Sequence, residues 1–218
     1  MWRRGLLPPG AFIDVAEQVG LMSALGQQVL QMATAQCRAW LDSGLRQPVA
    51  VNVSPTQFGD PGFVDSVLAT LRAAGLPPEL LSIEITESMA MADFDVTVGR
   101  LAELRRAGVR VAVDDFGIGF SNLSQLSRLP LDELKIDRSL IMQIGVDGKG
   151  EAIIRAIVGM THALGYKTIA EGIETSAQRN FLLNLRCETL QGYLFARPMD
   201  AAQLAHWQAT RRLQFEPA

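Results

Sequence analysis

Two adjacent carboxylates, Asp114 and Asp115, end a short run of branched apolar residues and are followed by a glycine-rich segment. The run is too short for a buried helix and is rich in valine, so it predicts a strand buried on both faces. Like charges at the end of a strand repel unless a cation or a hydrogen-bond donor lies between them. Carboxylate oxygens are ligands that Mg²⁺, Mn²⁺ and Ca²⁺ prefer. The pair therefore indicates a hard-metal site, and the alternative is that it only caps the following turn and helix.

Polar side chains also follow the other short apolar runs of the chain. They are Asn52, Glu84, Lys135, Glu171 and Gln191. Carboxylates, one amide and one lysine form the ligand set of a pair of hard divalent cations. Two such cations about 4 Å apart bind the attacking and leaving oxygens of a phosphoryl displacement and supply a hydroxide at neutral pH. Lys135 would add positive charge where negative charge develops, and Glu171 would accept a proton from water.

Several of these side chains also have an alternative role in the fold. The alternatives are an ion pair of Lys135 with Glu171 or Asp137, a turn cap at Asn52, and solvated helix starts at Glu87 and Glu174. The residue types and their spacing leave both interpretations open.

Strand patterns alternate with helix patterns along the chain. The predicted strands are 49–53, 81–87, 109–115, 131–137, 166–174 and 188–193. The predicted helices are 12–19, 21–42, 60–74, 93–107, 121–127, 150–164, 176–185 and 201–211. This alternation predicts parallel pairing with right-handed crossovers.

Polar residues at every predicted strand end favour a barrel, because a barrel gathers all its strand ends around one mouth. A closed barrel of this type has eight strands and about 250 residues. We therefore predict an α/β fold, a TIM-like (β/α)₈ barrel with about two N-terminal strands missing, in a single domain over residues 1–218. The first and last predicted strands would then have unpaired edges, which favour a homodimer or a strand-swapped oligomer unless upstream residues were removed.

The composition narrows the class of protein. The chain has 218 residues, 48% of them hydrophobic and 20% charged, as in a globular domain. A formal net charge of −3 gives no basic surface for a nucleic-acid polymer or an anionic membrane. Two cysteines and two histidines, all isolated, indicate neither a disulfide framework nor a zinc site. We find neither a signal peptide nor a run long enough to span a membrane, so we expect a cytoplasmic domain, which could belong to a larger protein.

The motifs together resemble the EAL family of bacterial cyclic-di-GMP phosphodiesterases. The matching segments are GLLPPGAFI at 5–13, VNVS at 51–54, IEITE at 83–87, DDFG at 114–117, KID at 135–137, EGIE at 171–174 and QGY at 191–193. They occur in the family's order over essentially the whole chain. The resemblance implies a modified (β/α)₈ barrel that hydrolyses cyclic di-GMP to linear pGpG with Mg²⁺ or Mn²⁺.

The resemblance also implies a role for each candidate residue. Asn52, Glu84 and Asp114 would bind one metal ion, and Asp114 and Asp115 the second. Lys135 and Glu171 would act around the attacking water, with Gln191 as polar support. Further support would come from Asp137, from Glu174 and from Glu87, which would brace the loop after Asp115 and link it to a dimer interface. A GGDEF-type or sensory domain is expected upstream.

Two departures from the family pattern matter for activity. The Glu-Ala-Leu segment that names the family, and the strand before it, are absent from this sequence, and Glu17 is not placed to replace that glutamate. We therefore expect weakened metal binding and an inactive or impaired isolated chain, because catalysis is sensitive to misplacement of about 1 Å. A non-catalytic module that serves as a cyclic-di-GMP receptor or an interaction domain is the alternative; a metal-dependent lyase or aldolase fits the motif order poorly. Ile118 also departs from the small residue or Thr usual at that loop position.

Overall fold

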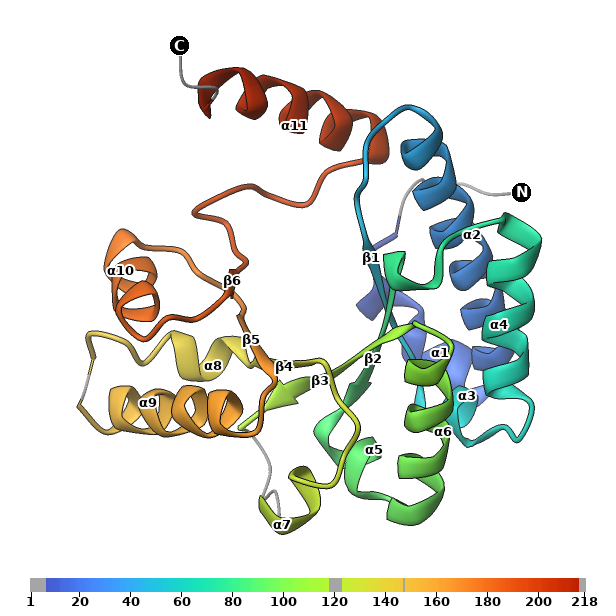
Figure 1. Cartoon of the computed structure of the whole chain (residues 1–218), viewed down its shortest axis with the longest axis horizontal. Coiled ribbons are helices and arrows are strands. Elements are labelled where there is room, and N and C mark those ends of the chain that lie inside the picture. The colour runs from blue at the N-terminus through green and yellow to red at the C-terminus, as the bar shows by residue number, and fades with distance from the viewer. Residues whose placement is uncertain (1–6, 118–122, 147, 216–218) are drawn as a thin grey trace.

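Runs of branched apolar residues form a parallel sheet in the computed structural model, which describes residues 7–117, 123–146 and 148–215, with side chains as far as residue 210. Within these residues the strands are β1 (Val49–Asn52), β2 (Leu81–Thr86), β3 (Arg110–Phe116), β4 (Glu133–Ile136), β5 (Lys167–Ala170) and β6 (Thr189–Leu190). They pair in chain order, all parallel, and β1 and β6 form the two edges. The predicted α/β class and parallel pairing are confirmed, and the sheet is a half-barrel, open between β1 and β6 (Figure 1).

Most helices lie between strands in the chain and pack around the outer face of the sheet, whereas α11 follows the last strand and lies apart from the sheet (Figure 1). The helices are α1 (Ile13–Gln18), α2 (Met22–Asp42), α3 (Pro55–Gly59), α4 (Phe63–Ala74), α5 (Glu87–Met91), α6 (Phe94–Arg106), α7 (Leu123–Leu126), α8 (Arg138–Ile141), α9 (Gly148–Ala163), α10 (Ser176–Asn184) and α11 (Ala201–Phe215). Short 3₁₀ turns, η1 (Pro9–Ala11) and η2 (Pro78–Leu80), precede α1 and β2. No helix of the described segments is long and apolar enough to cross a bilayer.

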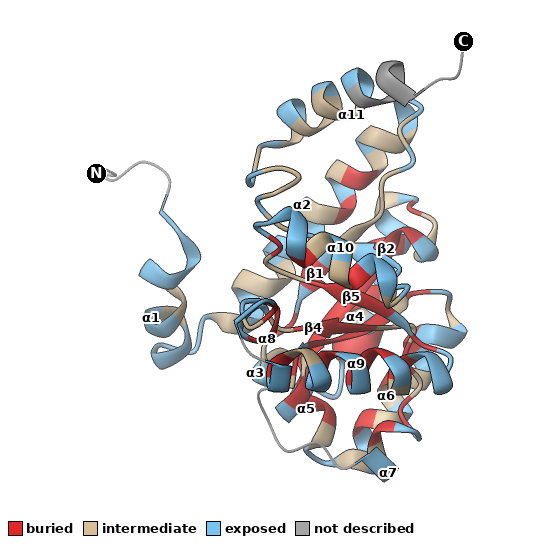
Figure 2. Ribbon diagram, turned by 90° about the vertical axis from the view of Figure 1, so that its left-hand side faces the viewer, coloured by how far each residue is buried: buried red, intermediate tan, exposed pale blue. Residues whose placement is uncertain are grey.

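The core lies along the central strands, which are red in Figure 2. Ile83 and Ile85 of β2 and Val111 and Val113 of β3 are fully buried. In β2 the polar Ser82 and Glu84 are buried too, so both faces of this strand are covered. Burial on both faces is why these strands read as nearly continuous apolar runs.

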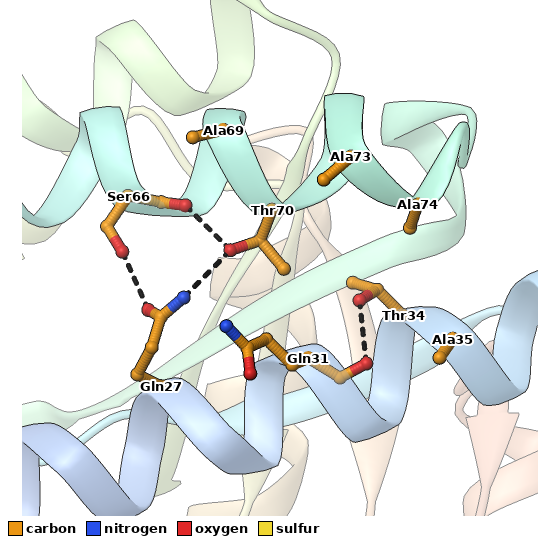
Figure 3. Close-up of a pocket in the computed structure, with 9 residues that line it drawn as sticks. All are labelled: Gln27, Gln31, Thr34, Ala35, Ser66, Ala69, Thr70, Ala73 and Ala74. Atoms are coloured by element: carbon orange, nitrogen blue, oxygen red, sulfur yellow. Dashed lines mark hydrogen bonds between the residues drawn. The ribbon is translucent and has the colours of Figure 1, made fainter.

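Contacts between helices join the beginning of the chain to the layer around the sheet. Gln27 of α2 bridges two residues of α4: its Nε2 donates to Thr70 Oγ1 at 3.0 Å, and its Oε1 accepts from Ser66 Oγ at 2.7 Å (Figure 3). At the other end of the chain, Gln208 of α11 donates to Gln47, just before β1, at 2.5 Å. The last helix therefore reaches across to the strand at the opposite edge of the sheet (Figure 1).

The structure corrects several predicted element bounds. The predicted helix 60–74 begins only at Phe63, as α4, and a short helix that was not predicted, α3, precedes it because Ser54 and Gln57 form a capping box. The predicted strand 81–87 ends at Thr86, whose side chain caps α5. The predicted strand 166–174 ends at Ala170, and residues 171–174 form a loop. Strand 188–193 shortens to β6, and the first two residues of the predicted helix 121–127 lie outside the described residues.

Candidate active site at the carboxyl ends of the strands

Lys135, on β4, contacts carboxylates from three other strand ends. Its Nζ lies 2.6 Å from Glu84 Oε2, 2.9 Å from Asp114 Oδ2 and 2.8 Å from Glu171 Oε1. The Lys135 and Glu84 side chains are each only 7% exposed, whereas that of Glu171 is 24% exposed. β2, β3, β4 and the residue after β5 therefore meet at one point, and Glu171 is the member of this carboxylate cluster that water reaches most easily.

Opposite charges keep the lysine of this cluster protonated. Burial alone lowers the pKa of Lys135, but Glu84, Glu171 and Asp114 outweigh burial, and the net pKa lies well above its ordinary value. Burial also raises the pKa of Glu84, while the Lys135 ammonium opposes that rise. The site thus has a buried cation at its centre, held among three carboxylates.

A bulge brings the two adjacent aspartates to the same edge of the sheet. The pairing of β3 with β4 shifts register between Val113 and Phe116, and Asp115 adopts a left-handed backbone with φ of 55°. Asp114 is buried and accepts the Asp115 amide at 2.9 Å, whereas Asp115 is exposed. Partial burial raises the pKa of Asp115, as do the nearby charges of Asp114 and Asp137, while Lys135 opposes the rise. A regular strand would have placed successive side chains on opposite faces.

Asn52 and Gln191 lie at the two edges of the half-barrel. Asn52 is in register with Glu84 on the neighbouring strand and is exposed. Gln191 follows β6, is also exposed, and is held through its backbone, whose amide donates to Ala170. Within the described residues neither side chain makes a hydrogen bond, and α3 is capped by Ser54 instead of Asn52.

The three predicted support residues contact the backbone or a nearby arginine. Glu87 is buried at the start of α5, and its Oε2 accepts the Gly117 amide at 3.0 Å. Asp137 caps α8 by accepting the Ser139 amide at 2.7 Å. Glu174 pairs with Arg138 at 2.6 Å. Ile118, the residue that departs from the usual loop pattern, lies outside the described residues.

Sequence reasoning did not single out Arg138 or Gly172. The position of Gly172, between the two glutamates of the 171–174 segment, was a usable signal, because glycine often marks close backbone approach. Gly172 has a φ of 72°, and a Cβ on it would lie 2.2 Å from Arg138 Cγ.

The residue types suit a hard divalent cation, although they do not form a ready metal cage. Asn52, Glu84, Asp114 and Asp115 offer amide and carboxylate oxygens, and the raised pKa of Asp115 reflects partial burial together with the like charges of its neighbours. Across the described part of the chain, however, no group of three or more His, Cys, Asp or Glu side chains is arranged to hold a metal ion. Lys135 lies between the carboxylates instead.

The family model of the EAL domain matches residues 2–198. The chain belongs to the EAL domain family. It is 46% identical over 203 residues to a bifunctional diguanylate cyclase/cyclic di-GMP phosphodiesterase, MucR of Pseudomonas aeruginosa, and 41% identical over 220 residues to the cyclic di-GMP phosphodiesterase NbdA of the same organism. Those alignments cover 93% and 99% of this chain but only 30% and 28% of the two relatives.

The fold of this EAL domain is also that of a solved relative. The structure described as the PaMucR phosphodiesterase in complex with c-di-GMP superposes with a TM-score of 0.89 at 45% sequence identity. The superposition covers 94% of this chain and 83% of the other. The six-stranded half-barrel of the described residues therefore has an EAL-type, TIM-like fold.

Proposed function

We propose that this EAL domain carries the site of a cyclic-di-GMP phosphodiesterase, which converts cyclic di-GMP to linear pGpG. The observation that carries the proposal is the contact of Lys135 with Glu84, Asp114 and Glu171, from the ends of separate strands. The names of MucR and NbdA and the nucleotide in the PaMucR complex support the substrate class. The relatives' greater length supports a setting beside other domains, for which a GGDEF-type or sensory domain is our proposal.

The proposed metal ions are Mg²⁺ or Mn²⁺. Asn52, Glu84 and Asp114 would hold one, and Asp114 and Asp115 would help to hold the other, since all present hard oxygen donors. When bound, these ions would supply Lewis acidity toward the phosphoryl group and lower the pKa of water. Removing metal with a chelator should therefore abolish turnover.

The residues of the chain itself would orient the substrate and move protons. Lys135 would stabilise the negative charge that develops on the phosphoryl oxygens. Glu171 is held by Lys135 through Oε1, so its other oxygen is available to accept a proton from the attacking water. The attacking water would give a proton to Glu171 as its oxygen bonds to phosphorus, the bond from phosphorus to the ribose 3′ oxygen would break, and that oxygen would take a proton from solvent water. Gln191 would orient the phosphate or the water through its amide.

The test is formation of pGpG by the purified chain with protein in excess over nucleotide, in the presence of Mg²⁺ or Mn²⁺. We expect slow turnover, because the donor oxygens are not preassembled around a metal in the described residues. Glu171→Ala should reduce product to background, and Glu103→Ala, which changes an exposed glutamate on α6, should not. Product formation that is insensitive to Glu171→Ala would refute the proposed chemistry.

A non-catalytic receptor for cyclic di-GMP is the second candidate function. It is favoured by the lack, in the described residues, of a ready cluster of metal ligands and by the occupation of the carboxylates by Lys135. Titration calorimetry separates the two candidates. The receptor is supported if cyclic di-GMP binds but no pGpG forms, even with protein in excess and with either Mg²⁺ or Mn²⁺ present.

The open edge of β1 supports a proposal about assembly. In the described sheet β1 pairs only with β2, so the backbone groups on its other side are free to pair with another chain. We propose a homodimer or a strand-swapped oligomer through this edge. Sedimentation should show self-association that Ala50→Lys weakens, since Ala50 is an exposed residue of β1. A monomer at all concentrations would contradict this proposal.

A further inference from the structure

Arg138 connects the end of β4 to the loop after β5. It is the first residue of α8, which follows the strand that carries Lys135. Its Nη2 lies 2.6 Å from Oε1 of Glu174, the last residue of the segment 171–174, which we call the Glu171 loop. The ion pair thus joins the neighbourhood of Lys135 to the loop that carries Glu171.

The stem of Arg138 also packs directly on this loop. A Cβ added to Gly172 would lie 2.2 Å from Arg138 Cγ and 2.7 Å from Arg138 Cδ. Gly172 has a φ of 72°, a conformation that glycine adopts readily and other residues adopt at a cost. Glycine therefore allows the aliphatic part of Arg138 to lie against the backbone, and the guanidinium continues past it to Glu174.

Backbone hydrogen bonds hold the Glu171 loop on either side of Gly172. Glu171 donates its amide to Ile136 at 3.3 Å, and Ile173 donates to Gln191 at 3.0 Å. The Glu174 amide donates to Gln178 Oε1 at 2.8 Å. Within the described residues no hydrogen bond is found for the Gly172 amide, so the contact with Arg138 covers the point where the backbone is least constrained.

We infer that Arg138 is a positioning residue that holds the Glu171 loop so that the Glu171 carboxylate stays at Lys135. This inference rests on the proposed function for its catalytic consequence. Arg138 acts through Gly172 and Glu174 and does not itself touch the carboxylate cluster around Lys135. Its loss should therefore slow hydrolysis, since a displacement of about 1 Å can cost about a hundredfold in rate.

The experiment compares three substitutions of Arg138 with a matched control. Arg138→Ala removes the stem and the charge, Arg138→Met keeps most of the stem, and Arg138→Lys keeps the charge. The control is Arg46→Met, because the Arg46 side chain is 58% exposed and pairs with Glu79 at 2.9 Å, while that of Arg138 is 59% exposed. Arg46 precedes β1 and contacts none of the carboxylates around Lys135.

Two measurements decide the inference. Hydrogen exchange of residues 171–175 should accelerate about tenfold in Arg138→Ala, while β5 keeps its protection. In Arg138→Ala the single-turnover rate constant for pGpG formation should fall at least about tenfold, while the Kd for cyclic di-GMP stays within about twofold of the wild-type value. Arg138→Lys should keep most of the wild-type rate. Arg46→Met should change none of these quantities.

Unchanged exchange in the Glu171 loop, or a rate equal to that of Arg46→Met, overturns the inference. If Arg138→Ala does not fold, Arg138→Met and Arg138→Lys give the same comparison with smaller changes. If the wild-type chain forms no pGpG, the proposed hydrolysis fails, and the exchange measurement still decides whether Arg138 holds the loop.

Discussion

The Lys135 ammonium lies 2.6 Å from the carboxylate of Glu84, and both side chains are 7% exposed. Removing one partner of a buried ion pair leaves the other charge without compensation. In this molecule the same ammonium also contacts Asp114 and Glu171, so one substitution leaves three carboxylates facing one another. The stability of the site and its proposed chemistry therefore depend on the same lysine.

Lys135→Met should lower the free energy of unfolding by about 3 kcal/mol, because Glu84 and Asp114 stay buried without a cation. Added Mg²⁺ or Mn²⁺ should recover part of this loss by binding the freed carboxylates. Urea denaturation with and without metal measures both effects. Lys149→Met, which removes an exposed lysine on α9, is the control, and an equal shift of the two midpoints would contradict the prediction.

Gly192→Ala should destabilise the fold by about 3 kcal/mol, because overpacking against rigid neighbours is costly. The added Cβ would lie 2.2 Å from both the backbone nitrogen and the backbone oxygen of Ile173, which cannot move aside as a flexible side chain could. Thermal unfolding measures the change. Gly159→Ala is the matched control: it lies in α9 with open space around its Cβ position, and we expect a gain of about 0.5 kcal/mol or more. A Gly192→Ala chain that melts like the wild type would show that the two loops are not in close contact.

Cys187 should make the fold less stable in alkali. Burial raises the pKa of its thiol to about 11 from its ordinary value of 9.0, and the side chain donates to the Thr168 and Thr189 carbonyls. Between these two pH values the folded chain keeps a proton that the unfolded chain has released, so stability falls as the pH rises through this window. The loss attributable to Cys187 should approach about 3 kcal/mol.

Urea unfolding of the wild type and of Cys187→Ala across this pH range measures the effect of the thiol. Other groups that titrate there, such as Tyr166, are present in both chains, so the difference between the two pH profiles belongs to Cys187. Parallel profiles would mean that the thiol does not titrate in a buried environment.

The sequence indicated the strands and their polar ends because both are local properties. A run such as 111–113 is apolar at successive positions, which is typical of a strand covered on both faces, and the polar residue after it marks the strand's end. The predicted bounds were less accurate where a side-chain cap competed with the strand pattern. Thr86 is the clearest example, since its hydroxyl starts α5 and ends β2 one residue earlier than the pattern predicted.

Residue types and spacing by themselves thus determined the α/β class, the order of the elements, and a set of hard oxygen ligands with one lysine at the strand ends. Only the tertiary structure decided which of these side chains meet. The register shift after Val113 places Asp114 and Asp115 at one edge, and the pairing of β2 and β4 on either side of β3 brings Lys135 to Glu84, 51 residues away. Arg138 and Glu174 likewise become partners although they are 36 residues apart. The physical reason is that a strand's pattern fixes which face a side chain occupies, whereas contacts between strands depend on register and bulges, which are set by packing across the whole sheet.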